Sequence, residues 1–141
     1  MWESNIASYN QVVGLGTQNV TAKEDSFAAC VSMAAALEGQ EADISEIKQA
    51  KGNKWEILSR YTQKTGLNLY GTNVNQILYY VGKEIPVIVG LGNNHYVVLM
   101  SYNSTKIRYK DPLAAEDVVV TKAQFEDMVN RAGNEYYSYI R

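Results

Sequence analysis

The chain has 141 residues but only one cysteine, Cys30, and one histidine, His95. A single cysteine excludes an intrachain disulfide. A structural zinc site would have to combine one sulfur and one imidazole with carboxylates, which is a rare ligand set, so we expect no metal. There is no cofactor motif either, and we expect no cofactor. If an imidazole serves as a general base near neutral pH, it must be that of His95.

The sequence also lacks blocks of like charge and long apolar runs. Its 13 basic and 15 acidic residues give a formal net charge of −2 and are dispersed, which argues against nucleic acid as a partner. No apolar run approaches the roughly 20 residues of a membrane span, and residues 1–5 do not form the start of a signal peptide. We therefore expect a soluble chain without direct membrane insertion. Its abrupt start is typical of a domain taken from a larger multidomain protein.

What the sequence does contain is enough apolar material for one core. Hydrophobic residues make up 46% of the chain and charged residues 20%, which is typical of a globular protein. The length is close to the commonest domain size. We expect a single domain over residues 1–141, with residues 1–19 as an N-terminal extension or loop.

Helix signals dominate the first half of the chain. Residues 26–38 are alanine-rich and almost uniformly apolar, with Asp25 as a candidate N-cap and Gly39 as the stop, which predicts a buried central helix. Further helices are predicted at 43–50, from Trp55 to a stop at Gly66, and at 73–81.

The second half of the chain has the period of strands. Strands are predicted at 85–90, 96–102, 106–110, 117–120 and 135–140. Thr121 and Gln124 predict a capping box that starts a helix ending near Arg131. Together the elements predict an α+β fold, with a helical N-terminal half whose buried central helix packs on an antiparallel sheet from the C-terminal half.

Three residues occupy positions where chemistry could occur. Ser26 opens the central helix, His95 opens a strand after a Gly-Asn-Asn turn, and Asp111 ends the next strand before Pro112. Taken singly, each has an ordinary structural interpretation, because serine is common at helix starts and Asp-Pro commonly ends a strand. Their joint occurrence in this order is what favours a functional site.

This arrangement resembles the papain-like cysteine peptidases, and most closely the bacteriocin-processing peptidases that remove double-glycine leaders. The resemblance rests on the run from Asp25 to Gly39, on Pro86-Val87-Ile88-Val89 and His95-Tyr96-Val97-Val98-Leu99, and on Tyr109-Lys110-Asp111-Pro112. It implies a papain-like fold, a peptide or protein substrate, and a nucleophile at position 26 with His95 and Asp111 as partners. It also implies a bacterial protein, in the cytoplasm or as a secreted or delivered effector, and the sequence does not decide between these locations.

The chemistry of such enzymes explains the residue types. A helix N-terminus carries about half a positive charge, which with a neighbouring imidazolium lowers the pKa of a thiol, so the nucleophile belongs at a helix start. The imidazole needs a third group that fixes its tautomer, which is the role that the resemblance gives to Asp111. The family also supplies an oxyanion-stabilising glutamine shortly before the nucleophile.

The sequence departs from the family pattern at two positions. Ser26 stands where the cysteine is expected, and a serine hydroxyl is far less acidic than a thiol, so we expect little or no peptidase activity. The glutamine position falls on Val20, with Gln18 two residues upstream as the candidate oxyanion donor. The only thiol, Cys30, lies one turn inside the apolar helix and is predicted to be a core residue.

Several functions remain open from the sequence. The leading interpretation is a cysteine peptidase domain whose nucleophile is replaced by serine, most simply by engineering, and which is inactive in this form. A natural pseudo-peptidase that binds peptides without cutting them is the second interpretation. A glutamine deamidase of the toxin or effector type would use the same three groups, and a serine hydrolase built on Ser26, His95 and Asp111 is the least favoured alternative.

Overall fold

The structure is a computed structural model that describes residues 10–141. Its elements are β1 (Asn10–Gln11), the 3-10 helix η1 (Lys23–Asp25), α1 (Ser26–Leu37), α2 (Ile44–Gln49), α3 (Lys54–Thr62), β2 (Thr65–Asn68), α4 (Val74–Gly82), β3 (Val87–Gly90), β4 (Tyr96–Tyr102), β5 (Lys106–Lys110), β6 (Val118–Thr121), α5 (Lys122–Arg131) and β7 (Tyr136–Ile140). Of the predicted N-terminal extension, residues 1–19, the first nine residues lie outside the described part of the chain. In residues 10–19, β1 is the one regular element.

All the strands belong to one antiparallel sheet with the order β2-β7-β3-β4-β5-β6. Strands β3 to β6 form the meander that the sequence predicted. Strand β7 then returns across the sheet to pair with β3, and β2 pairs with its outer edge. Strand β1 pairs with the end of β4, with Gln11 opposite Ser101.

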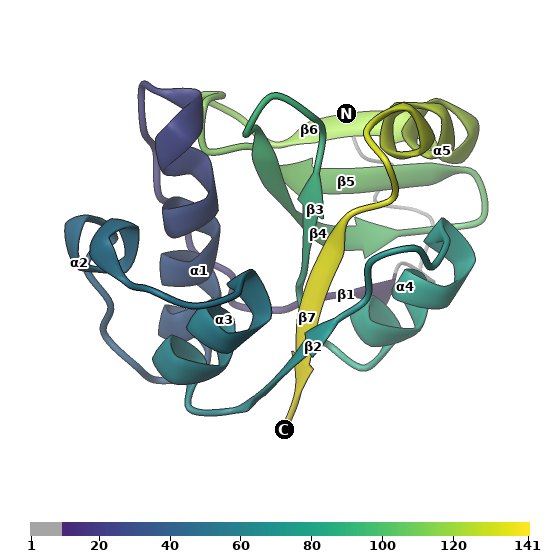
Figure 1. Ribbon diagram of the computed structural model, residues 1–141. Helices are drawn as coiled ribbons and strands as arrows, with labels where there is room; N and C mark the ends of the chain where they lie inside the picture. The colour runs from purple at the N-terminus through teal and green to yellow at the C-terminus, as the bar shows by residue number, and fades with distance from the viewer. Residues whose placement is uncertain (1–9) are drawn as a thin grey trace.

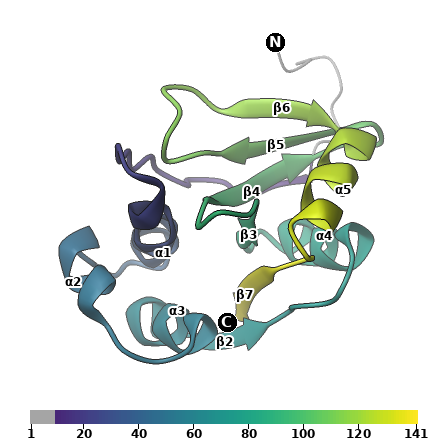
Figure 2. The ribbon, with the colours of Figure 1, turned by 45° about the horizontal axis from the view of Figure 1, so that its top comes forward.

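Helices cover both faces of the sheet (Figures 1 and 2). Helices α1, α2 and α3 lie together on one side, whereas α4 and α5 lie on the other. Burial on both faces explains why β3 is apolar throughout and not alternating, since all four of its residues are buried. The α+β arrangement of a buried central helix on an antiparallel sheet confirms the predicted fold class.

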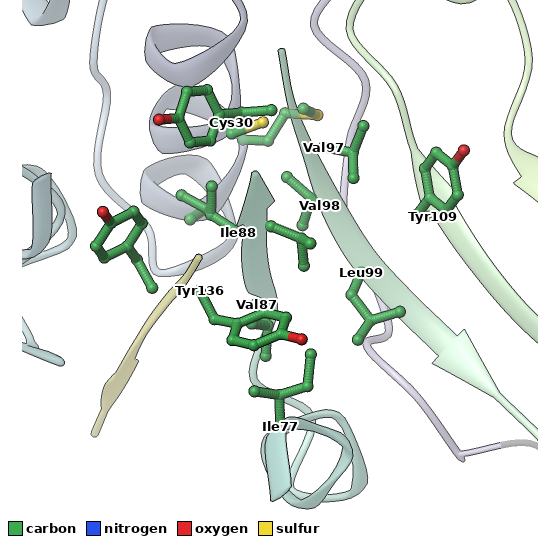
Figure 3. Close-up of a cluster of buried hydrophobic side chains, with 14 of the residues drawn as sticks. Cys30, Ile77, Val87, Ile88, Val97, Val98, Leu99, Tyr109 and Tyr136 are labelled. Atoms are coloured by element: carbon green, nitrogen blue, oxygen red, sulfur yellow. The ribbon is translucent and has the colours of Figure 1, made fainter. Parts of the chain in front are cut away.

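The core is formed by α1, α4 and the central strands. Figure 3 shows Cys30 on α1 facing the sheet, with Ile88 on the same side, whereas Val87 lies beside Ile77 of α4. These four residues are at most 1% exposed. The helix is therefore held against the sheet by close apolar packing, which fixes the position of its first residue, Ser26.

The local structure differs from the sequence prediction in three places. The helix predicted from Trp55 to a stop at Gly66 is α3, which ends earlier, at Thr62, because Gln63 adopts a left-handed conformation with φ of 59°. Asp25 occupies the N-cap position of α1 but makes no capping hydrogen bond, because the chain enters α1 directly from η1 and its carboxylate pairs instead with Lys48 at 2.7 Å. Strand β2 was not predicted. It contains Gly66, where a β-carbon would overlap the carbonyl oxygen of Trp55, so that the close approach of α3 requires glycine at this position.

Across residues 10–141, no helix is long and apolar enough to cross a membrane. The same part of the chain contains no group of three or more histidine, cysteine or acidic side chains placed to hold a metal ion.

Candidate active site

Two neighbouring strands bring His95 and Asp111 together. His95 directly precedes β4 and Asp111 directly follows β5, and these strands are antiparallel with Val98 opposite Lys110. The start of one strand therefore lies beside the end of the other. The Nε2 atom of His95 is 2.8 Å from Oδ1 of Asp111, and the two side chains are 21% and 13% exposed.

The turn before β4 fixes where the imidazole begins. Asn93 and Asn94 both have left-handed backbone angles, with φ of 54° and 62°. Asparagine tolerates this conformation better than most residues. The His95 amide donates to the Gly92 carbonyl at 3.0 Å, and the His95 carbonyl accepts from the Leu91 amide at 2.8 Å. The turn is thus closed by hydrogen bonds on both sides of the histidine.

The surroundings of Asp111 select one tautomer of the imidazole. Oδ1 of Asp111 accepts from the Leu113 amide at 2.9 Å as well as facing Nε2 of His95. Because a carboxylate can only accept, the hydrogen of neutral His95 belongs on Nε2. This leaves the lone pair on Nδ1, which is the arrangement needed for a general base oriented by a carboxylate.

Ser26 lies beside the histidine but is bonded to the backbone around it. Its hydroxyl faces the carbonyl oxygens of Lys23 at 2.7 Å and Asn94 at 3.0 Å as donor, and accepts from the Tyr96 amide at 2.8 Å. The residue is 0% exposed. In residues 10–141, no hydrogen bond joins this hydroxyl to the imidazole of His95.

A hydroxyl has one hydrogen, and two carbonyls already compete for that of Ser26. A nucleophilic serine would have to direct this hydrogen to a base and present its oxygen to the substrate. In this structure the oxygen instead connects the start of α1 to the turn that carries His95. The side chain is therefore a buried structural residue that links these two elements by hydrogen bonds.

Gln18, the candidate oxyanion donor, has no hydrogen bond to Ser26, His95 or another described residue. It is exposed and lines a small cavity that Asp111 and Met33 also line. The structure thus places Gln18 near Asp111 without joining it to Ser26 or His95.

A cleft opens beside the candidate centre. Its volume is about 380 Å³, and its lining includes Phe27, Tyr96, Asn94 and Lys54. Phe27 follows Ser26 and Tyr96 follows His95, and their rings meet edge to face with centroids 5.3 Å apart. Edge-to-face pairs are favourable for aromatic rings, so this wall is a defined surface next to the centre.

The remaining contacts of Tyr96 hold that wall in place. Its hydroxyl donates to Oε2 of Glu135 at 2.8 Å, and the hydroxyl of Tyr137 donates to the same oxygen at 2.7 Å. Burial, together with the carboxylate of Glu135, raises the pKa of both tyrosines above the ordinary range. Both phenols therefore remain protonated donors at physiological pH.

Cys30 is a core residue, as predicted. It is 0% exposed, and burial, together with the charge of Asp111, raises the pKa of its thiol well above the usual value. The thiol lies one turn beyond Ser26, inside the packed layer between α1 and the sheet. It is not available as a nucleophile.

The fold is that of a C39-like peptidase of known structure. A family model described as the Peptidase_C39-like family matches residues 5–137, and the chain belongs to this family. The crystal structure of a Bacillus anthracis protein described as a C39-like peptidase has a TM-score of 0.80 and 15% sequence identity, over 95% of this chain and 98% of that chain. No curated protein matches the chain.

These comparisons confirm the predicted relationship to papain-like cysteine peptidases and establish a peptidase-type domain. The wall of the cleft was not predicted from the sequence. Phe27 and Tyr96 are the immediate neighbours of two candidate residues, and this adjacency was the available signal. Lys54 gave no such signal, because only the tertiary structure brings α3 to the same cleft.

Proposed function

We propose that this domain has the scaffold of a cysteine peptidase and that, with serine at position 26, it binds a peptide or protein segment without hydrolysing it. The observation that carries the proposal is the bonding of Ser26, whose buried hydroxyl is held by backbone groups on both sides of His95. The cleft lined by Phe27 and Tyr96 provides room for the substrate.

The orientation of His95 supports a cysteine peptidase as the parent chemistry. In a Ser26→Cys variant, Nδ1 of His95 would take the thiol proton, and the thiolate would attack the peptide carbonyl. As the carbon–nitrogen bond breaks, His95 would return the proton to the leaving amine, and water would then release the acyl group. Asp111 would hold the Nε2 hydrogen throughout. A weakly hydrogen-bonding sulfur would also be held less firmly by the backbone than the serine oxygen is.

The serine-hydrolase alternative has less support, because it needs the Ser26 hydrogen directed at His95. The deamidase alternative uses the same groups as the peptidase and differs in the bond that is cleaved. A deamidase releases ammonia from a glutamine side chain, whereas a peptidase produces two shorter peptides.

The test compares the chain with its Ser26→Cys variant and with a Ser26→Cys, His95→Ala double variant. Each is treated with a thiol-reactive peptide probe and with a peptide library, and the products are read by mass spectrometry and by ammonia release. We expect the unchanged chain to bind peptides and cleave none, and the single variant to react in a manner that needs His95. Because Cys30 is also a thiol, the modified residue is identified by peptide mapping.

An inert Ser26→Cys variant, with peptide binding retained, would overturn the cysteine-peptidase part and leave a binding domain. Cleavage by the unchanged chain would overturn the assignment of Ser26 as a structural residue. Absence of both binding and reaction would overturn the proposal as a whole.

A further inference from the structure

One positive charge of the cleft has no counterion among residues 10–141. Lys54 is the first residue of α3, and its Nζ lies 5.7 Å from the ring centroids of both Phe27 and Tyr96. No carboxylate of the described chain forms an ion pair with it. The ammonium group thus lies over the aromatic wall of the cleft, within reach of a cation–π interaction with both rings.

The position of Lys54 on its helix is electrostatically unfavourable. The N-terminus of a helix carries partial positive charge and favours acidic residues. The same turn follows this rule elsewhere, because Glu56 and Asn53 form a capping box there. The stability of α3 therefore does not explain why a lysine occupies this position.

The other charged residues that line the cleft are arranged differently. Lys48 is paired with Asp25 at 2.7 Å, so its charge is compensated. Glu24 also lines the cavity, but it forms no ion pair with Lys54. Lys54 is therefore the cation of this cleft that a ligand could neutralise.

We propose that Lys54 determines substrate specificity by pairing with a carboxylate of the bound peptide. This inference rests on the proposed function, because it concerns the occupant of the same cleft. The rings of Phe27 and Tyr96, together with Ile47 and Ile57, offer an apolar surface next to the ammonium. The occupant that matches both features is a segment in which an acidic residue is adjacent to a hydrophobic one.

The experiment measures binding of the unchanged chain to short synthetic peptides in which each position is varied. Aspartate is compared with asparagine and glutamate with glutamine, because these pairs differ in charge and hardly in shape. We expect one position at which the acid binds about three- to tenfold more tightly than its amide, with the difference shrinking as salt is added.

Two variants and a control assign that preference to Lys54. Lys54→Gln should abolish the difference between acid and amide, and Lys54→Glu should reverse it in favour of lysine or arginine at the same peptide position. The matched control is Lys51→Gln, since Lys51 is exposed, is three residues away and does not line the cleft. The control should keep the full preference.

The outcomes separate this inference from the proposed function. If peptides bind but acids and amides bind equally, or if the preference survives in Lys54→Gln, the assignment of Lys54 is wrong and the binding function stands. If no peptide binds to the unchanged chain, the proposed function itself fails.

Discussion

Replacing Ser26 by alanine tests whether this side chain stabilises the fold by linking the start of α1 to the turn before β4. The change removes the acceptor of the Tyr96 amide, which is 2.8 Å from the serine oxygen in a fully buried position. The Lys23 carbonyl keeps a partner, because the backbone amide of Ser26 also donates to it. The Asn94 carbonyl also loses the serine hydroxyl as a donor, but Asn94 is an exposed residue. The main consequence is therefore one unsatisfied buried N–H group.

The expected effect follows from the cost of such a group. Leaving a buried donor unsatisfied costs about 1–3 kcal/mol. Alanine has the better helix propensity, which offsets up to about 0.5 kcal/mol. We therefore expect Ser26→Ala to lower the free energy of unfolding by about 1–2 kcal/mol, and the melting temperature by roughly 3–7 °C for a domain of this size.

Urea unfolding and thermal melting measure this effect, with Ser45→Ala as the control. The hydroxyl of Ser45 also lies near a helix start, where it donates to the exposed carboxylate of Asp43 at 2.7 Å. Its removal should change the free energy of unfolding by less than about 0.5 kcal/mol. The reasoning on Ser26 would be refuted if the two alanine variants were equally stable.

Three further predictions concern the rest of the fold. Gly66→Ala should cost at least about 3 kcal/mol of stability or prevent folding, because the new β-carbon would overlap the Trp55 carbonyl oxygen. The control is Gly16→Ala, whose new β-carbon has no atom within 4 Å and which should be close to neutral in the same urea titration. Burial acts to raise the pKa of Glu38, but hydrogen bonds from Arg141 and Tyr139 outweigh it and hold the pKa below the ordinary value. Stability from this group should be complete above the unfolded pKa of about 4.3 and be lost as the pH falls through the lower folded pKa, and urea titrations across this range should show a smaller loss in Glu38→Gln. Cys30 should resist iodoacetamide at about pH 8 in the folded chain and react fully in urea, and rapid labelling of the folded chain would contradict its burial.

The sequence by itself determined the order of the α-helices and of the strands from β3 to β7, but not β1, η1 or β2. The alanine-rich run after Asp25 predicted α1, and the capping box of Thr121 and Gln124 is present as expected. These signals are local, because helix propensity and caps depend on neighbours within a few residues. The order of Ser26, His95 and Asp111 was also sufficient to indicate the papain-like family.

The tertiary structure decided what surrounds those residues. Strand β2 had no signal of its own, since its pairing with β7 joins Gly66 to Tyr139, which is distant in the sequence. Whether the Ser26 hydroxyl faces His95 or the backbone depends on how α1 packs against the turn before β4. The position of Lys54 over two rings likewise depends on the packing of α3 beside α1. Such long-range contacts are set by the fit of whole elements in the core, and no local pattern records them.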